Sequence, residues 1–575
     1  MLASAYTTFF QIFPPQSMAL TCLIIAIVAA TGLWLGSIKI GSFSLGIPGV
    51  MFTGLLFGHL IGQGNFNDQV IFFLRDFGLI LFVYAVGVQV GPGFLATLRK
   101  AGLPLNSLAV AIVVIGAGMA IGVAYLTHMD MKAAVGLFAG GTTNAPAFGS
   151  AQEALKSVHP ETMPSAGGAV AIKGMFEASN VTLPAFAISY PFGLLGVILA
   201  MVILRGIFRA KPGAEAEILE KAEAAEKQEL TSWSIEVSNP NLNGLPLKEL
   251  PAIDRSGVVV SRVHHGGRVQ VATSETPVYT GDVLLAIGEP AEVKDFQLIV
   301  GKKSSIDLRS LPSEITTRQV LVTHGEVLGK TVKELQLAKK FGVTVTRVQR
   351  TGLEFTAVGN LKLQFGDRVR VVGEASGISS AAKLLGDSAR ELNHPRLLPI
   401  FVGIALGVTL GSIPVFVGGL PAPVKLGLAA GPMIVAIILA RLGRVGNLIW
   451  YMPQSASGLL RELGIVMFLI AVGMNGGDGF FNKVFTAEGG LYLAMGALIT
   501  ILPLLVVGLF ARLAMKMNYL HICGLLCGSM TSPSLAFTQT MTASEAPAVA
   551  FATVYPLTMI MRVLVAQILI LVFAR

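Results

Sequence analysis

Two segments of this chain lie far apart and have nearly the same sequence. Residues 73–94 read FLRDFGLILFVYAVGVQVGPGF, residues 459–480 read LLRELGIVMFLIAVGMNGGDGF, and ten of the 22 positions are identical. Each copy places one arginine, Arg75 or Arg461, beside a long apolar run. Internal duplication of apolar sequence, with a charge in each copy, is typical of proteins that move a solute across a bilayer.

The composition places most of the chain in a membrane. Of its 575 residues, 53% are hydrophobic and 13% are charged, and the mean hydropathy is +0.70. Many apolar runs approach the ~20 residues that a helix needs to cross a bilayer. The net charge of +9 fits basic loops facing anionic lipid. Because no basic cluster is interleaved with aromatic residues, we do not expect nucleic acid as a partner.

The duplication extends well beyond the opening pair. Short matches recur in the same order and at similar offsets: 35–38 at 410–413, 45–47 at 426–428, 136–140 at 524–528, and 187–191 at 552–556. Chance similarity between apolar helices would not keep a common offset. We therefore interpret residues 18–208 and 394–574 as two structural repeats.

The sequence of each repeat predicts about five membrane spans and one segment that glycine and proline interrupt. We expect spans near 18–36, 43–62, 71–90, 105–127 and 183–205, and again near 396–414, 423–441, 458–476, 489–513 and 551–573. The broken segments lie near 133–155 and 522–541. An odd number of crossings inserts the second repeat upside down relative to the first. Basic residues that follow the spans then face the cytoplasm; they include Arg99, Lys100, Arg205, Arg441, Arg444 and Arg512.

A polar block at about 212–390 separates the repeats and is expected in the cytoplasm. Strand and turn signals alternate twice within it: GVVVSRV and GDVLLAIG, at 257–263 and 281–288, recur as GVTVTRV and GDRVRVVG, at 342–348 and 366–373. The repeated order resembles a tandem pair of TrkA-C (RCK-C) domains, which are small α+β modules.

The fold class that we expect is thus a polytopic α-helical membrane protein. Two inverted-topology repeats of about five spans each, both with a Gly/Pro-broken segment, are split by a soluble α+β block. The expected divisions are a first membrane repeat at 1–211, a connector and first TrkA-C-like domain at 212–303, a second TrkA-C-like domain at 304–390, and a second membrane repeat at 391–575.

Arg75 and Arg461 are the first candidates for substrate binding. An arginine near mid-membrane costs ~2.5–3.5 kcal/mol on insertion scales, so it needs a partner or a function. Its planar fork suits a carboxylate; the alternative is that both arginines reach the headgroups from the ends of their spans. Asp76 and Glu462 follow them, but neighbours on a helix point about 100° apart, so we do not expect direct pairs.

The broken segments predict a substrate site near the membrane midplane. Residues 140–148 read GGTTNAPAF and residues 528–537 read GSMTSPSLAF. Unwound backbone at membrane depth must face protein or a water-filled cavity, and its free N–H groups attract anions. Small-residue helix packing is the alternative. The residues expected to bind substrate here are Gly141, Thr142, Thr143, Asn144, Pro146, Ser529, Thr531, Ser532, Pro533 and Ser534.

Two Tyr-Pro pairs recur in the last span of each repeat. These are Tyr190-Pro191 and Tyr555-Pro556. Each proline removes a helix hydrogen bond, so the pairs predict either a hinge or site-lining kink, or a plain structural kink.

Three further features of the spans are less regular. Arg562 lies in the final span without a counterpart in the first repeat, and we expect it to neutralise a carboxyl group of the substrate or of the protein. Asp478 is expected in a loop. Residues 169–181 are expected to form an amphipathic or re-entrant stretch.

The chain lacks the motifs of enzymes and metal sites. Its histidines do not cluster into a metal-binding pattern, and neither a Walker A motif nor a catalytic serine or zinc motif is present. We therefore expect no cofactor, no metal and no catalytic residue.

The whole architecture resembles the aspartate:alanine exchanger family. Its marks are IKIGSFSLG at 38–46, the Leu-Arg-Asp/Glu-x-Gly stretches at 74–78 and 460–464, and the paired broken segments. The resemblance implies a homodimeric exchanger of amino acids or dicarboxylates in a bacterial inner membrane. It also implies that Arg75 matches a family arginine thought to matter for transport. The TrkA-C modules are then the expected place for a regulatory nucleotide or ion.

These features favour a secondary antiporter that exchanges small carboxylates or amino acids, of the aspartate/alanine or dicarboxylate type, by alternating access. Two alternatives stay open. One is a ligand-gated ion channel or ion-coupled transporter regulated by its TrkA-C domains, although the Thr-Val-Gly-Tyr-Gly filter of potassium channels is absent. The other is a membrane sensor that binds its ligand without transport.

Overall fold

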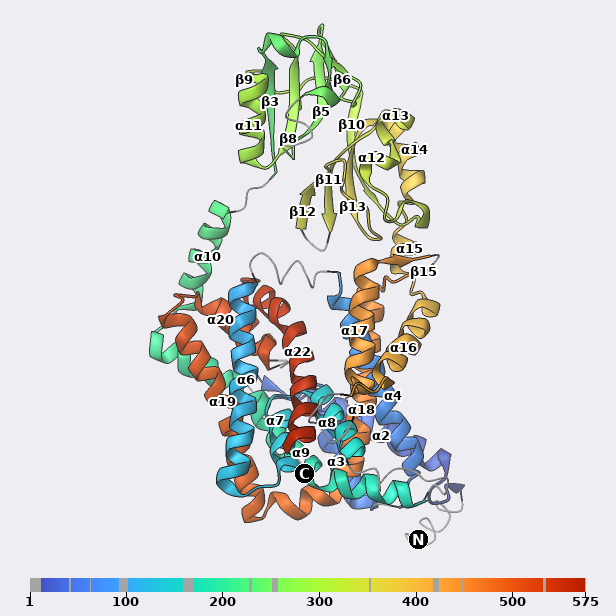
Figure 1. The fold of residues 1–575 in the computed structure, drawn as a ribbon, viewed down its shortest axis with the longest axis vertical. Helices are drawn as coiled ribbons and strands as arrows, with labels where there is room; N and C mark the ends of the chain where they lie inside the picture. The colour runs from blue at the N-terminus through green and yellow to red at the C-terminus, as the bar shows by residue number, and fades with distance from the viewer. Residues whose placement is uncertain are drawn as a thin grey trace. The chain divides into compact units, whose positions relative to one another are not determined.

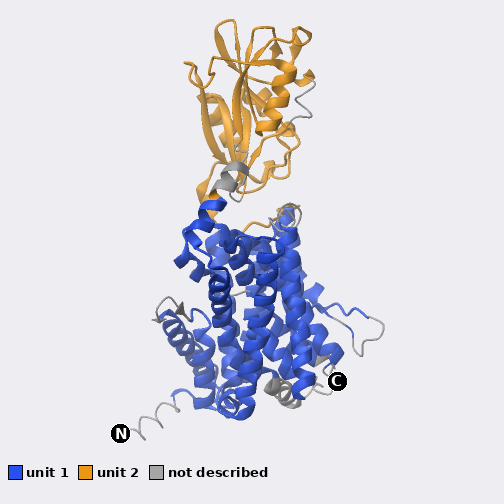
Figure 2. Cartoon of the chain, turned by 90° about the vertical axis from the view of Figure 1, so that its left-hand side faces the viewer, with its two compact units in different colours: residues 1–219, 397–442, 454–575 blue, residues 220–396, 443–453 orange. Residues whose placement is uncertain are grey.

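The computed structural model describes most of the chain as two compact units (Figure 2). Unit 1 comprises 1–219, 397–442 and 454–575, and unit 2 comprises 220–396 and 443–453. The described residues are 12–40, 43–62, 64–92, 102–158, 169–226, 230–250, 257–350, 353–416, 423, 425–446, 448–530 and 534–573.

Unit 1 is built from helices that follow the same order in each half of the chain (Figure 1). The first half contains α2 (Met18–Ser37), the hairpin β1 (Lys39–Ile40) and β2 (Phe43–Ser44), α3 (Gly49–Ile61), α4 (Asp68–Val90), α6 (Leu103–Thr127), α7 (Met131–Gly141), α8 (Ala145–Val158) and α9 (Ala169–Phe208). The second half contains α16 (Leu397–Ser412), α17 (Gly427–Leu442), α18 (Gln454–Val484), α19 (Ala487–Leu513), α20 (Tyr519–Ser529), α21 (Leu535–Met541) and α22 (Ala546–Phe573).

These helices confirm a polytopic membrane protein. Among the described residues, eight helices are long and apolar enough to cross a bilayer. Both predicted broken segments are pairs of shorter helices, α7 with α8 and α20 with α21. The second span of each repeat is shorter than expected. α3 starts only at Gly49, because Gly46 takes a left-handed φ of +60° and turns the chain before the helix begins.

Two other expectations about the spans are wrong. The re-entrant alternative for residues 169–181 is wrong, because α9 runs without interruption from Ala169 to Phe208. Asp478 does not lie in a loop but inside α18, where its Oδ1 lies 2.9 Å from Nδ1 of His59 on α3. The glycines before Asp478, Gly476 and Gly477, pack against Leu55 and His59 of α3 within this helix.

The duplicated segments pack directly on one another. α4 and α18 cross at Gly78 and Gly464, the glycines that follow the two matched arginines. A Cβ atom placed on Gly78 would lie 2.7 Å from the carbonyl oxygen of Gly464, and one placed on Gly464 would lie 2.5 Å from the amide nitrogen of Phe82. The two backbones can approach this closely only because neither residue has a side chain.

The two halves of unit 1 repeat other close contacts at matched positions. In each case a helical glycine packs on the backbone carbonyl group of another segment, and the partner position is the same in both repeats. The pairs are Gly36 with Gly46 and Gly411 with Gly427, Gly136 with Thr182 and Gly524 with Pro547, and Gly140 with Phe186 and Gly528 with Phe551.

Unit 2 contains two antiparallel sheets of similar construction. The five-stranded sheet has the order β6-β5-β8-β3-β9 and the four-stranded sheet the order β10-β13-β11-β12. Both carry a bulge at matched positions, between Val260 and Arg262 and between Val345 and Arg347. The connector α10 (Pro212–Glu226) leads into this unit.

The strands of the first module are β3 (Thr231–Val237), β4 (Leu245–Pro246), β5 (Val259–His265), β6 (Arg268–Val271), β7 (Pro277–Val278), β8 (Val283–Gly288) and β9 (Gly301–Lys303). Its helices are η2 (Pro240–Leu242), η3 (Leu247–Glu249) and α11 (Pro290–Val300). The second module has β10 (Ile315–Leu321), β11 (Thr344–Arg350), β12 (Leu353–Thr356), β13 (Arg368–Glu374), η4 (Gly325–Val327), α12 (Val332–Leu335), α13 (Leu337–Phe341) and α14 (Ala375–Leu385), and α15 (Ala389–Asn393) follows.

The loop between α17 and α18 belongs to the second of these modules. It forms the hairpin β14 (Arg444–Val445) and β15 (Leu448–Ile449). Ile449 is buried in the apolar core of the module, and the ring of Tyr451 lies 4.6 Å from that of Phe365. Arg444 donates a hydrogen bond to the carbonyl oxygen of Gly325. A segment from the second membrane half therefore completes the core of a soluble module.

We predict that Gly464→Ala destabilises unit 1. The new methyl group would overlap the α4 backbone, so the helices must separate, at a cost of about 1–3 kcal/mol in the free energy of unfolding. Thermal unfolding of the detergent-solubilised protein would show this as a lower Tm. Gly458→Ala on the same helix is the control, because a Cβ there meets no atom within 4 Å. Equal Tm values for the two variants would contradict the tight crossing.

Candidate functional site

The two broken segments meet inside unit 1. α7 ends at Gly141 and α20 ends at Ser529. The Oγ1 of Thr143, in the turn after α7, donates a 2.7 Å hydrogen bond to the carbonyl oxygen of Met530, in the turn after α20. Thr143 has a φ of +51°, which is uncommon for a β-branched residue and indicates that the turn is held by its surroundings.

The polar groups around this crossing are buried and most of them bind backbone. The side-chain oxygen of Asn144 accepts the N–H of Ala147 at 2.8 Å in the first turn of α8, where Pro146 costs no helix hydrogen bond. Thr142 donates to the carbonyl oxygen of Phe138 in its own helix. Ser534 donates to the carbonyl oxygen of Leu194 on α9 at 3.2 Å. Breaking the helices frees backbone groups, and these side chains satisfy a part of them.

The predicted site residues Gly141 and Ser529 mark the ends of the two broken helices. The carbonyl oxygen of Gly141 accepts a 2.7 Å hydrogen bond from the hydroxyl of Thr500 on α19. The carbonyl oxygen of Ser529 accepts a 2.9 Å hydrogen bond from Nε of Arg562 on α22. Thr531, Ser532 and Pro533, which were also expected here, lie outside the described residues.

Arg562 is fully buried in unit 1, with 0% of its surface exposed. Besides Ser529, its Nη2 lies 3.2 Å from Sδ of Met530, and the guanidinium lies 5.4 Å from the centre of the Phe138 ring. The sequence predicted a carboxyl partner. Within the described part of the chain, Arg562 instead caps the carbonyl end of a helix, where a positive charge is favoured by the helix dipole.

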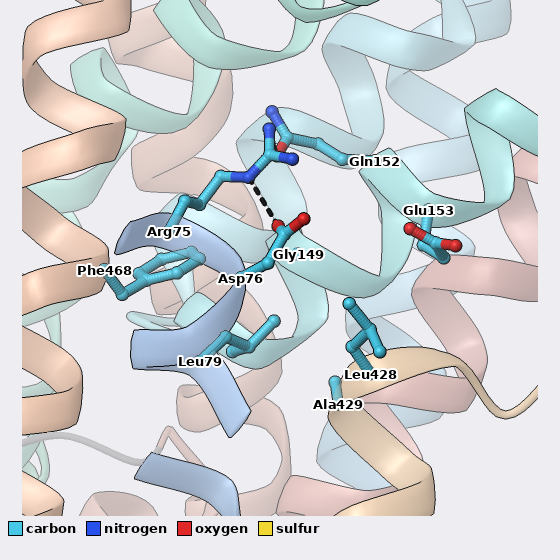
Figure 3. Close-up of a pocket in the computed structure, with 9 residues that line it drawn as sticks. All are labelled: Arg75, Asp76, Leu79, Gly149, Gln152, Glu153, Leu428, Ala429 and Phe468. Carbon is cyan, nitrogen blue, oxygen red and sulfur yellow. Dashed lines mark hydrogen bonds and ion pairs between the residues drawn. The ribbon is translucent and has the colours of Figure 1, made fainter. Parts of the chain in front are cut away.

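Arg75 lies beside a separate small pocket (Figure 3). Only 5% of its surface is exposed. Its Nε donates to Oδ1 of Asp76 at 2.8 Å, and its Nη1 lies 3.5 Å from Oε1 of Gln152 on α8. The expectation that Arg75 and Asp76 do not pair directly is wrong, because the long arginine side chain folds back across the 100° that separates neighbours on a helix.

Four helices, α4, α8, α17 and α18, contribute to the Arg75 pocket. Its volume is about 10 Å³, and its lining residues are Arg75, Asp76, Leu79, Gly149, Gln152, Glu153, Leu428, Ala429 and Phe468. Such a volume is about one water molecule. Figure 3 shows Asp76 and Gln152 turned toward the guanidinium, while Glu153 projects beside Leu428. The pocket thus combines one fixed positive group with two carboxylates in an apolar wall.

The sequence analysis placed Arg75 and the two broken segments in one site, but the structure places the Arg75 pocket apart from the crossing of the broken segments. Asn144 precedes α8 and Gln152 lies in its interior, so the crossing and the Arg75 pocket are about 12 Å apart along the axis of α8. Gln152 and Glu153 were missed as site residues. The signal that was available is a Gln-Glu pair within an otherwise small and apolar sequence.

Arg461 occupies the position on α18 that matches Arg75 on α4, but its surroundings differ. It is half-buried, and it has no hydrogen-bond or ion-pair partner among the residues that the structure describes. The two repeats therefore use their matched arginines differently.

The Tyr-Pro pairs lie within continuous helices, α9 and α22. The ring of Tyr190 packs edge-on against Phe186 at 5.4 Å, and the ring of Tyr555 stacks on Phe551 at 5.1 Å. Phe186 and Phe551 are also the residues on which Gly140 and Gly528 pack. Each pair therefore stands next to the broken segment of its own repeat.

The fold and the buried polar crossing define a class: a multi-pass membrane transport protein with soluble modules. Comparison with known proteins agrees. Residues 24–206 and 399–571 match the family model Asp-Al_Ex, described as "Predicted Permease Membrane Region", and residues 234–301 and 318–386 match the TrkA-C domain. The chain belongs to this permease family and carries two TrkA-C domains in its centre.

Two similar proteins come from Histophilus somni, strains 2336 and 129Pt. Each is named "Putative transport protein" and is 40% identical to this chain over 558 residues, which are 96% of this chain and 98% of the relative. No solved structure gave a significant match.

We predict that Thr143→Val weakens the contact between the two broken segments. Valine keeps the shape but leaves the buried Met530 carbonyl without this donor, which should cost about 1–3 kcal/mol. The measurement is hydrogen–deuterium exchange, with faster exchange expected in both turns. Thr409→Val, which removes an exposed hydroxyl bonded within its own helix α16, is the control. Unchanged exchange in the Thr143 variant would mean that the bond does not hold the turns together.

Proposed function

We propose that this protein is a secondary antiporter that exchanges small carboxylates or amino acids, of the aspartate/alanine or dicarboxylate type, by alternating access in a bacterial inner membrane. The observation that carries the proposal is the hydrogen-bonded contact of two broken helices within the membrane unit. Discontinuous helices of this kind form the substrate and ion sites of many secondary transporters.

We propose that the two repeats have inverted topology. The α17–α18 loop supports this, because residues 443–453 belong to the same compact unit as the soluble block. The chain leaves that block through α16 and returns to it after α17, as a pair of crossings would produce. Arg441 and Arg444 at this loop fit a cytoplasmic side. Five crossings in the first repeat then place the second repeat upside down.

Arg75 is proposed to bind the carboxylate of the substrate. It is buried against protein, which argues against a role as a headgroup anchor. Asp76 and Gln152 fix its guanidinium, so little side-chain entropy remains to be lost on binding. A substrate of several carbon atoms is larger than the present pocket, so α4 and α8 must separate to admit it. Such a movement is what alternating access requires.

The remaining site residues are proposed in two groups. Those of the crossing and the second arginine are proposed to line the path of the substrate: Gly141, Thr142, Thr143, Asn144, Pro146, Arg461, Ser529, Thr531, Ser532, Pro533 and Ser534. Those of the last spans are proposed as hinge or lining positions: Tyr190, Pro191, Tyr555, Pro556 and Arg562. The TrkA-C domains are proposed to bind a regulatory nucleotide or ion, and the protein to be a homodimer.

Counterflow in proteoliposomes tests the proposed function. Vesicles loaded with labelled aspartate should release it only when aspartate, alanine or a dicarboxylate is supplied outside. A steady current without any counter-substrate would indicate a channel. Binding of aspartate without flux would indicate a sensor.

We predict that Arg75→Gln lowers the rate of exchange by about tenfold to a hundredfold, because a hydrogen bond to a charged group contributes about 1.5–3 kcal/mol. Initial rates of counterflow at limiting substrate would measure the change. Arg441→Gln is the matched control, since it removes an exposed arginine at the end of α17. Full activity of the Arg75 variant would reassign this arginine to a structural role.

We predict that cysteines at Arg99 and Arg441 react with a membrane-impermeant maleimide only after cells are permeabilised, whereas a cysteine at Phe485 reacts in intact cells. Phe485 is exposed between α18 and α19, one crossing beyond the α17–α18 loop. The background should be a Cys22→Ser chain, because Cys523 and Cys527 are buried. Opposite accessibility of the cysteines at 99 and 441 would contradict the inverted topology.

A further inference from the structure

We propose that Arg562 and Ser529 form a binding site for a small monovalent anion at the carbonyl end of α20. The observation behind the proposal is a pair of buried donors. Among the residues that the structure describes, Nη1 of Arg562 and Oγ of Ser529 each have no hydrogen-bond partner, and both residues are 0% exposed. The guanidinium lies against the backbone of Ser529, because Nε of Arg562 donates to the carbonyl oxygen of Ser529 at 2.9 Å.

A buried guanidinium needs compensation for its lost hydration. An unpaired charge within a membrane segment is costly, and native proteins compensate it with an opposite charge or with hydrogen bonds. Among the described residues Arg562 forms no ion pair, and Nη2 donates to the weakly accepting sulfur of Met530 at 3.2 Å. The described protein groups therefore leave one nitrogen of this guanidinium, Nη1, without an acceptor, and a bound anion could supply one.

Capping of the helix does not by itself explain the charge. The first repeat has the same broken helix, and there the neutral hydroxyl of Thr500 donates to the carbonyl oxygen of Gly141 at 2.7 Å. When the two repeats are aligned on their Tyr-Pro pairs, the residue that matches Arg562 is Val197, which is buried and uncharged. One repeat thus closes its helix end with an uncharged donor, whereas the other places a full positive charge beside a second, unused hydroxyl.

The chemistry of the two donors defines the ligand. An N–H of a guanidinium and the O–H of a serine can both donate to one oxygen or one halide, whereas the positive guanidinium has no acceptor and repels an ammonium group. The ligand class is therefore a carboxylate or a small inorganic anion. If it is a carboxylate, it is that of a transported substrate, so this part rests on the proposed function. If it is chloride, the ion stays bound as a part of the structure, and the site does not depend on the proposed exchange of substrates.

Thermal unfolding of the full-length protein in detergent tests the site. Sodium acetate and sodium chloride are titrated separately, and bulky sodium gluconate holds the ionic strength constant. A specific anion that binds only the folded state should raise the Tm by a few degrees and then saturate. The wild-type protein and the Arg75→Gln variant should both show this rise with acetate or chloride.

Variants of the two donors distinguish the proposed site from others. Arg562→Gln should lose the saturable rise. Ser529→Ala removes only the unused hydroxyl and keeps the fold, and it should weaken the apparent affinity about threefold to tenfold. Absence of a saturable rise in the wild-type protein, or the same affinity in wild type and Ser529→Ala, would overturn the proposal. Loss of the rise in Arg75→Gln alone would also overturn it, by moving the anion to the Arg75 pocket.

Counterflow on the same preparations separates this inference from the proposed function. A higher KM for aspartate in Ser529→Ala, together with stabilisation by acetate, supports a substrate carboxylate at the site. An unchanged KM, with stabilisation by chloride alone, supports a resident anion. Lack of exchange in the wild-type protein would contradict the antiporter and leave the binding result standing.

Discussion

The close approach of backbones at matched glycines is the constraint on which the membrane unit depends. Between helices in lipid the hydrophobic effect contributes little, so association relies on tight packing. Gly78 and Gly464 let the two duplicated helices cross with backbone against backbone. Similar glycine contacts recur at matched positions in both halves, including those that hold each broken helix against the last span of its own repeat. Substitution of either glycine at the crossing therefore affects both halves.

This packing brings together groups that would be costly to bury alone. A broken helix exposes carbonyl and N–H groups, which the lipid cannot satisfy. Thr143 satisfies the Met530 carbonyl, Thr500 satisfies that of Gly141, and Arg562 satisfies that of Ser529. The polar residues of the crossing thus have a structural role in the described state. Two donors at the crossing, on Arg562 and Ser529, have no partner among the described residues, and there we propose that an anion binds.

Much of the architecture was predictable because duplication and hydropathy are local properties of the sequence. The repeats, the two broken segments and the paired soluble modules all follow from such patterns. The site was less predictable, because it depends on which residues of distant helices face one another. Nothing in the sequence indicates that Arg75 faces Gln152 on α8, about 12 Å along the helix from the crossing, or that Arg562 caps α20. The direct Arg75–Asp76 pair was missed because helix geometry describes Cβ directions, not the reach of a flexible side chain.

The α17–α18 loop has a consequence for the order in which the protein is made. The soluble block emerges from the ribosome before α16 and α17, and domains generally fold as they emerge. Ile449 and Tyr451, however, pack into its second module from a position beyond both helices. That module can reach its final core only after α16 and α17 have been synthesised and inserted. Completion of the second soluble module would thus report that α16 and α17 have entered the bilayer.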